Sequence, residues 1–237
     1  MRVITWNCNM AFRKKAHFIV SKSPDILIVP ECESLEKLKF EHEFDLPNSF
    51  LWFGENQNKG LGVFSFGKYE LELLPVHNPE IKTVLPIKVS GGAIDFVLLA
   101  IWANNPKDKD GAYIEQVFKA IHFYEELLTE ETTILMGDFN SNTIWDKKNR
   151  LNNHSNVVQK LFDKKIKSVY HFFNGYEQGK EQHHTLYMYR HLNKPYHIDY
   201  CFASVDFIQR LKSVEIGDYN DWISLSDHTP VIVDFDI

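Results

Sequence analysis

Met136-Gly137-Asp138-Phe139-Asn140 is the stretch that decides the fold of this 237-residue chain. It follows the apolar run 132–135, which predicts a buried strand that enters a loop. Gly137 relaxes the backbone where the strand ends. If the chain stays extended, Asp138 and Asn140 point the same way, so an anionic acceptor lies beside an amide. Such a pair suits the positioning of a water beside a phosphate, although Asp and Asn also favour ordinary turns.

A second predicted strand covers residues 2–7, where apolar and polar residues alternate. It ends at Asn7, and Asn9 shares the face of Asn7 if the chain stays extended. The basic residues 13–15 then open a short helical stretch, in which we expect them to form a solvated face.

The run 26–29 is apolar on both faces and predicts a central strand that is covered on both sides. It ends near Glu31 and Glu33. A carboxylate at the mouth of a buried strand is costly unless it is paired or bound to a cation, and Mg²⁺ would suit Glu31. The alternative is an acidic cap for a short helix over 34–40, which fits Glu33 better than Glu31.

Two further acidic positions lie near the C-terminus. Asp199 lies within the alternating run 196–202, which predicts a strand. Asp227 and His228 directly precede the last predicted strand, which begins at Val231. An adjacent Asp and His at that place are suited to general acid–base chemistry.

The rest of the chain alternates between strand and helix patterns. We expect an amphipathic helix over 112–128, a further helix around 157–162, and a loop over 170–195 at the rim of the active site. This loop is rich in His and Tyr but lacks the spacing of a zinc site. Short strands are predicted at 50–54, 62–66, 69–74, 83–89 and 95–102.

Composition limits the class of protein. The 44% hydrophobic content suffices for one large core, so we expect a single domain over 1–237. The net charge of −6 argues against a broad, sequence-independent duplex binder. Cys8, Cys32 and Cys201 lack metal-site spacing, which favours reduced thiols and a cytoplasmic location. We expect no signal peptide and no membrane span.

The order of these motifs resembles the endonuclease/exonuclease/phosphatase superfamily, which includes pancreatic-deoxyribonuclease-like enzymes. The likeness extends from Thr5 to the C-terminus, and Gly-Asp-Phe-Asn at 137–140 and Ser-Asp-His at 226–228 are its most specific parts. The resemblance implies an α/β fold of the deoxyribonuclease I type: a four-layer α-β-β-α sandwich of two packed mixed β-sheets flanked by helices. It also implies a Mg²⁺-dependent phosphoesterase, for which Mn²⁺ could substitute.

The resemblance also implies a role for individual residues on the metal side. Glu31 matches the metal-binding Glu of the family, and Asn7 matches the Asn beside it. Asp227 matches the Asp that supports the metal or the nucleophile. A cation held there would neutralise charge and polarise the phosphoryl oxygen.

On the catalytic side, Asp138 matches the Asp that orients or deprotonates the attacking water, with Asn140 as its partner. Asp199 matches the Asp that pairs with the catalytic histidine, here His228. A protonated His228 would bind the phosphoryl oxygens as charge grows on them, and Asp199 would keep it protonated.

Two departures from the family pattern bear on the substrate. Asn9 replaces an Asp of the abasic-site endonucleases, and Trp102 replaces a His or Tyr that is frequent in nucleases. Asn105 matches a phosphate-contacting Asn. We expect these three residues, together with His184 and Tyr187 of the 170–195 loop, to contact substrate.

The sequence therefore predicts a monomeric phosphodiester hydrolase, most simply a nuclease that acts on DNA or RNA by in-line attack of water. A phosphatase or phosphodiesterase for a small molecule or lipid head group is the alternative, since this superfamily covers many phosphoesters. A non-catalytic binding module with the same fold is a third reading, and the retained acidic residues and histidine argue against it.

Overall fold

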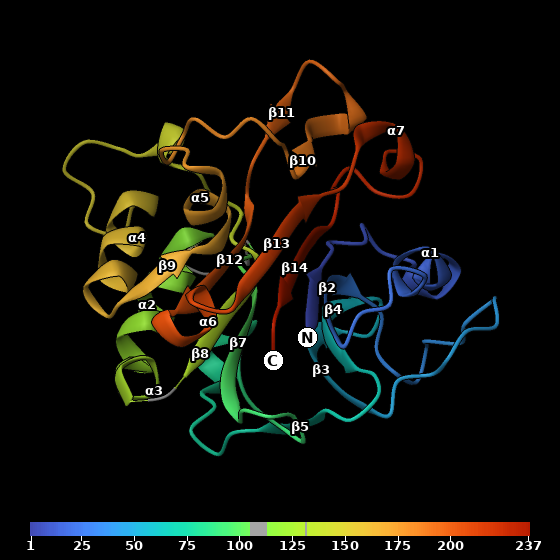
Figure 1. Cartoon of the computed structure of the whole chain (residues 1–237). Coiled ribbons are helices and arrows are strands. Elements are labelled where there is room, and N and C mark those ends of the chain that lie inside the picture. Colours follow the sequence, from blue (N-terminus) through green and yellow to red (C-terminus); the bar gives the residue numbers. More distant parts are fainter. Residues whose placement is uncertain (105–112, 131) are drawn as a thin grey trace.

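Two six-stranded β-sheets pack face to face, and helices cover their outer faces (Figure 1). This computed structural model describes residues 1–104, 113–130 and 132–237. The two termini lie side by side in the first sheet, because β1 and the last strand pair with each other. None of the helices in these ranges has the length and apolar character that a membrane span requires.

The first sheet contains strands from both ends of the chain. Its β1 and β2 are parallel, whereas its other neighbours are antiparallel, so the sheet is mixed. In spatial order its strands are β13 (Leu211–Ile216), β14 (Val231–Phe235), β1 (Arg2–Thr5), β2 (Ile26–Cys32), β4 (Lys59–Ser65) and β3 (Ser49–Asn56).

The second sheet is also mixed, with β7 and β8 as its parallel pair. The middle strands come from residues that the sequence marks as strongly apolar. In spatial order its strands are β5 (Glu70–Leu73), β6 (Val84–Ser90), β7 (Phe96–Trp102), β8 (Thr133–Asp138), β12 (Asp199–Ser204) and β9 (Ile166–Ser168).

Helices and short elements connect and cover the sheets. The helices are α1 (Ala16–Val20), α2 (Ile114–Phe123), α3 (Glu125–Glu130), α4 (His154–Asp163), α5 (Val169–Asn174), α6 (Val205–Ile208) and α7 (Tyr219–Trp222). The short elements are η1 (Phe12–Lys14), η2 (Pro79–Ile81), η3 (Thr143–Trp145), η4 (Met188–Arg190) and the two-stranded ribbon of β10 (Leu186–Tyr187) with β11 (Pro195–Tyr196).

Strand alternation separates the core into three layers. On β2, Ile26 points between the sheets, and Leu27 points to the outer face under α1. On β7, Leu98 points between the sheets, and Leu99 packs with residues of α2 and α4. Because both faces of these strands are buried, their sequences are continuously apolar. The predicted four-layer α-β-β-α arrangement of two mixed sheets is confirmed.

Several local predictions were wrong. Residues 34–40 form no helix, because Glu33 instead accepts a hydrogen bond from the backbone N–H of Phe12 at 2.7 Å and pairs with Arg13. The helix expected over 112–128 is two helices, α2 and α3, separated at Tyr124. Lys15 is not solvated, since its ammonium donates to the backbone carbonyls of Cys8 and Leu225.

The segment 170–195 is also more structured than the predicted loop. It contains α5, β10 and η4, and its His171 forms a buried ion pair with Glu181 at 3.0 Å. The three cysteines are free and buried, as their apolar surroundings in the sequence predicted.

Candidate active site

Strand register brings three of the predicted residues together at one end of the central strands of the second sheet. Asp138 ends β8, and its cross-strand neighbours are Trp102 at the end of β7 and Asp199 at the start of β12. In the facing sheet, Asn7 follows β1, Glu31 lies near the end of β2, and His228 precedes β14. Residues from almost the whole length of the chain therefore meet where the two sheets converge.

Asp138 is fully buried at this edge and holds three hydrogen bonds. Asn7 Nδ2 donates to it at 2.9 Å, the Asn140 backbone N–H at 2.8 Å, and Asn140 Nδ2 at 3.0 Å. The expectation that Asn140 follows in an extended chain was wrong, because its φ of 47° is left-handed. That turn folds Asn140 back onto Asp138, so the two side chains meet through a tight loop.

Gly137 has a steric reason for its place in the motif. Its φ is +147°, and a Cβ at this position would lie 1.8 Å from the carbonyl oxygen of Ile101 on β7. Any side chain would push β7 and β8 apart. The glycine thus allows Asp138 to stand directly beside Trp102 in the register.

Glu31 lies on the side of the first sheet and has a left-handed φ of 65°. Its Oε1 is 3.5 Å from Asn7 Nδ2 and 3.0 Å from Lys59 Nζ. Lys59 begins β4 and also lies over the Trp102 ring, 5.2 Å from the ring centroid. Asn7 therefore links the two carboxylates, Glu31 and Asp138, and Lys59 gives Glu31 a positive partner.

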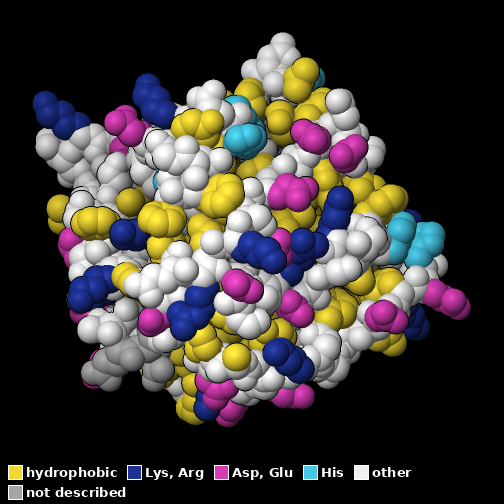
Figure 2. Space-filling view, viewed as in Figure 1, with side chains coloured by type: hydrophobic (Ala, Val, Ile, Leu, Met, Phe, Trp, Pro, Cys, Tyr) yellow, Lys and Arg dark blue, Asp and Glu magenta, His cyan; other side chains and the backbone are white. Residues whose placement is uncertain are grey.

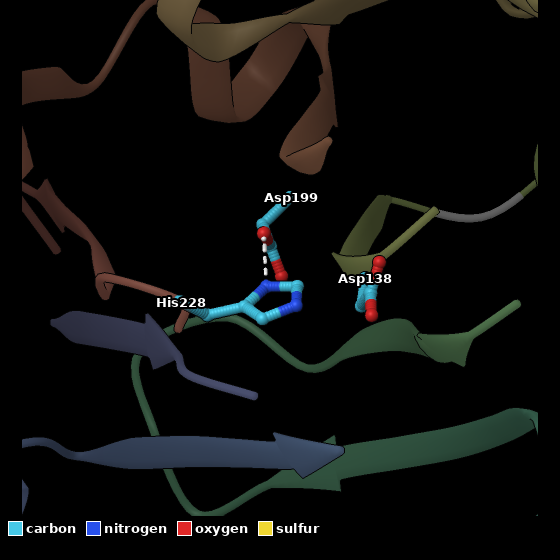
Figure 3. A group of neighbouring side chains, drawn as sticks. All are labelled: Asp138, Asp199 and His228. Carbon is cyan, nitrogen blue, oxygen red and sulfur yellow. Dashed lines mark hydrogen bonds and ion pairs between the residues drawn. The ribbon is translucent and has the colours of Figure 1, made fainter. Parts of the chain in front are cut away.

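Asp199 and His228 form a buried ion pair, with His228 Nδ1 2.9 Å from Asp199 Oδ2 (Figure 3). The Ser226 hydroxyl fixes the histidine backbone, since it accepts from the His228 N–H at 3.0 Å and donates to the Asn7 carbonyl. The Thr185 hydroxyl similarly accepts from the Asp199 N–H at 3.0 Å. The sequence marked Ser226 only as part of the Ser-Asp-His motif and did not predict this supporting role, and Thr185 lies in no motif that would have indicated one.

Charge and burial shift the protonation equilibria of this cluster. Burial and the repulsion of Asp199 raise the pKa of Asp138 to about 7. Burial alone would lower the pKa of His228, but Asp199 and then Asp138 outweigh it and raise this pKa to about 10. The raised pKa of His228 favours its cationic form at neutral pH, and the raised pKa of Asp138 makes this carboxylate a stronger proton acceptor than a free aspartate. A carboxylate in that condition can accept a proton from water.

The loop after β1 carries Asn9, whose Nδ2 donates to Asp227 Oδ1 at 2.6 Å. Asn9, Met10 and Ala11 all have left-handed φ, so Asn9 does not extend from Asn7 as expected. Instead, the Asn9 N–H donates to Asn7 Oδ1 at 3.0 Å. The contact to Asp227 links this loop to the loop that carries the histidine.

Two adjoining cavities open onto the site. The smaller, of about 370 Å³, is lined by Glu31, Lys59, Trp102, Asn104, Tyr113 and Asn140. The larger, of about 670 Å³, shares Tyr113 and Asn140 with it. The other residues that line the larger cavity include Trp145, Lys147, Arg150, Leu186, Met188 and Ile198. Asn140 thus stands between a small polar cavity and a larger one with apolar, aromatic and basic walls.

The structure does not bring every predicted substrate residue to these cavities. From the segment around β10, Leu186 and Met188 line the larger cavity, whereas Tyr187 packs against Tyr219 at 4.6 Å. His184 lies beside Tyr187, with its ring centroid 6.2 Å away. Asn105 lies outside the described residues. The substrate-binding roles of Asn9, Trp102, Asn105, His184 and Tyr187 stay predictions.

The donor atoms near Glu31 fit a hard divalent cation. Such ions prefer carboxylate and amide oxygens, and Mg²⁺ keeps several waters, for which the 370 Å³ cavity provides space. Asp138, Asp199 and His228 also form a cluster whose ligating atoms lie within 4.8 Å of one another. Asp199 Oδ1 is buried there without a hydrogen-bond partner in the described part of the chain. An acidic, partly unsatisfied site of this kind suits a cation.

No protein-family model matches the sequence, and no curated protein matches it either. Solved structures, however, share its fold over the whole chain. A 3′ phosphatase, NExo, from Neisseria, bound to a product DNA hairpin, has 19% identity and a TM-score of 0.69, with both chains covered completely. An AP endonuclease from Archaeoglobus fulgidus has 17% identity and a TM-score of 0.68, again with complete coverage of both. An endonuclease/exonuclease/phosphatase family protein from Leptotrichia buccalis has 14% identity and a TM-score of 0.63 over both full chains. These likenesses confirm the predicted fold of the deoxyribonuclease I type.

Proposed function

We propose that this protein is a metal-dependent phosphodiester hydrolase, and specifically a nuclease that acts on DNA or RNA. The observation that supports the proposal is the position of Asp138, a buried carboxylate held by Asn7 and Asn140 beside the His228–Asp199 ion pair. The proton acceptor Asp138 and the cationic ring of His228 thus lie within one cluster. Hydrolysis of a phosphodiester by water needs this combination, because the nucleophile loses a proton while the phosphoryl group gains charge.

In this mechanism Asp138 accepts a proton from the attacking water as its oxygen bonds to phosphorus. The phosphorus–oxygen bond to the leaving group breaks, and the released oxygen takes a proton from solvent water. Asn7 and Asn140 hold its carboxylate in place through three hydrogen bonds, so the water meets the phosphorus along a fixed line. His228 donates from its ring to a phosphoryl oxygen that becomes more negative in the transition state. Asp199 binds the opposite ring nitrogen, fixes the orientation of His228 and keeps it protonated.

Glu31, with Asn7 and Asp227, would hold Mg²⁺, or Mn²⁺ in its place. When bound, the ion supplies charge neutralisation and Lewis-acid polarisation of the phosphoryl oxygen. The Asn7 amide must then present its oxygen, which now accepts from the Asn9 N–H, to the ion. The short link from Asn9 to Asp227 would hold the third ligand near this position.

The substrate class follows from the larger cavity. Trp145 and Lys147 on its wall offer one aromatic surface and one cation, which suit a nucleobase and a phosphate beside it, while Arg150 pairs with Glu115 on the same wall. The similar structures include a 3′ phosphatase bound to a DNA hairpin and an AP endonuclease, which agrees with a nucleic-acid substrate. On the face seen in Figure 2, basic and acidic side chains are interspersed, so no broad basic surface is visible there.

The test is a panel of labelled DNA and RNA substrates and small chromogenic phosphoesters, each with Mg²⁺, Mn²⁺ or EDTA. The proposal expects nucleic-acid cleavage that requires the ion and falls at least about 100-fold in Asp138→Asn and His228→Gln. Asp206→Asn, a change on an exposed carboxylate in α6, past the end of β12 that is opposite to Asp199, serves as the control. Equal turnover by the wild type and both site variants would overturn the assignment. Turnover of small phosphoesters alone would move the substrate class away from nucleic acid.

The molecular organisation completes the proposal. Strands from both termini are interleaved in the first sheet, which supports a single domain over 1–237. A monomeric state and a cytoplasmic location stay predictions from composition and from the three free cysteines.

A further inference from the structure

Lys59 is a feature of the site that the mechanism above does not use. It begins β4, and its ammonium lies between two different partners. Glu31 Oε1 is 3.0 Å away, and the Trp102 ring centroid is 5.2 Å away. The side chain is 38% exposed, so it is neither locked in the core nor free in solvent. Its position is set by one carboxylate and one aromatic surface, both of which face the smaller cavity.

The smaller cavity offers a place where an anion could bind Lys59. Among the described residues that line it, Lys59 carries the positive charge, and Asn104 and Asn140 supply amide groups. Asn140 also binds Asp138, so an anion in this cavity would lie beside the proposed proton acceptor. A phosphate needs a cation and hydrogen-bond donors, and an ammonium on a flexible stem provides both without fixed geometry.

A divalent ion on Glu31 would change the partners of Lys59. The ion and the ammonium would compete for the same carboxylate oxygen, and like charges a few ångströms apart repel each other. The lysine can then turn away from Glu31 while its ammonium stays over the Trp102 ring. Such a turn leaves the ammonium at the cavity, where a phosphate would neutralise it.

We propose that Lys59 is a phosphate-binding residue that is held by Glu31 until a divalent ion takes its place. This inference rests on the proposed function, because it assumes that Glu31 binds the ion. In the metal-free protein, Lys59 neutralises Glu31. In the loaded protein, Lys59 binds the phosphate of the substrate from the Trp102 side of the cavity, and the aromatic surface limits the path of its movement.

This exchange predicts two opposite effects of removing the ammonium. Loss of a competing cation makes the divalent ion bind more tightly, by about threefold, the scale of a partly exposed ion pair. Loss of a charged donor makes phosphate bind about tenfold more weakly. The exchange also links the two ligands, since each should strengthen the binding of the other, and that coupling should be smaller without Lys59.

The experiment compares the wild type with Lys59→Gln and Lys59→Arg by isothermal titration calorimetry. Mn²⁺ alone is titrated first, and inorganic phosphate is then titrated with and without saturating Mg²⁺. Lys68→Gln is the matched control. Lys68 also lies over an aromatic ring, with its ammonium 5.4 Å from the Tyr69 centroid, and this substitution removes the same charge outside both cavities. Thermal unfolding checks that each variant is folded.

The inference expects Lys59→Gln to bind Mn²⁺ about threefold more tightly and phosphate about tenfold more weakly, with KM raised more than kcat is lowered. Lys59→Arg should keep most of the phosphate affinity, and Lys68→Gln should match the wild type. If Lys59→Gln binds both ligands as the wild type does, while the wild type cleaves phosphodiesters, Lys59 has no such role. If the wild type neither binds Mn²⁺ nor cleaves any substrate, the proposed function fails together with this inference.

Discussion

Replacing Asp199 with Asn would remove the charge of the His228 partner and leave its shape almost unchanged. Both side chains are almost fully buried, at 1% and 6% exposure. An amide at this position can still accept from His228 Nδ1 across the present 2.9 Å. The variant therefore isolates the electrostatic part of the pair from packing and from the hydrogen bond itself.

The magnitude follows from the protonation of His228. Its pKa rises from 6.5 to about 10 on folding, so the stabilisation from the charged ring is complete below pH 6.5 and disappears as the pH rises towards 10. At pH 7 this amounts to several kcal/mol, and at pH 9 to less than half of that. Asp199 also repels the Asp138 carboxylate. Replacing Asp199 with Asn relieves this repulsion, and the relief offsets part of the lost stability. We expect a net loss of about 2–4 kcal/mol at pH 7, within the range for a broken buried ion pair.

The assay is urea unfolding of the wild type and Asp199→Asn at pH 7 and pH 9, in buffer with EDTA so that no divalent ion stabilises either protein. The difference in the free energy of unfolding should shrink by more than half between the two pH values. Asp206→Asn should show no difference at either pH, because that side chain is exposed. A difference that is the same at pH 7 and pH 9 would refute the reasoning, since it would show that the lost stability is not linked to the His228 proton.

Three further predictions concern the fold that supports the site. Gly137→Ala should lose more than about 3 kcal/mol or fail to fold, because the new Cβ would meet the Ile101 carbonyl at 1.8 Å; an unchanged melting temperature would contradict this. Lys15→Met should lose about 1–3 kcal/mol in urea unfolding, because two backbone carbonyls lose a charged donor; a variant as stable as the wild type would show that water replaces it. Burial lowers the pKa of His154 to about 4, so the protein should have its full stability above pH 6.5, where this histidine is neutral in both the folded and the unfolded state. The free energy of unfolding should fall by up to about 3 kcal/mol as the pH is lowered to 4. His154→Asn should flatten that acid slope, and an identical slope would place the effect elsewhere.

The sequence predicted the buried strands because their signals are local, whereas the two-sheet arrangement was implied by the family resemblance. The runs at 26–29 and 96–102 are apolar at every position, and β2 and β7 are indeed covered on both faces. The polar residues of the site could be found for a related reason. Each follows or begins such a strand, and strands that run in parallel bring their carboxyl ends to the same edge. Asn7, which follows β1, and Glu31, which lies near the end of β2, illustrate this rule.

The features that the sequence did not predict depend on contacts between distant segments. Lys59 stands in a turn-like sequence, and only the fold places it beside Glu31 and Trp102. The helix expected over 34–40 fails because Glu33 binds the η1 segment, a tertiary contact that outweighs local helix propensity. The left-handed residues Asn9 to Ala11 contain no glycine that would mark the turn. In each case the deciding partner is remote in sequence.

The site is divided between the two sheets, and this division explains why its geometry depends on the core. Asp138 and Asp199 belong to the second sheet, whereas Asn7 and His228 belong to segments of the first. The hydrogen bond from Asn7 to Asp138 at 2.9 Å and the ion pair from His228 to Asp199 at 2.9 Å therefore both cross from one sheet to the other. A shift of the sheets by about 1 Å would lengthen both contacts beyond hydrogen-bond range. In the proposed mechanism the apolar layer between the sheets would therefore support catalysis as well as the fold, because close packing fixes the distance between Asp138 and the His228 ring.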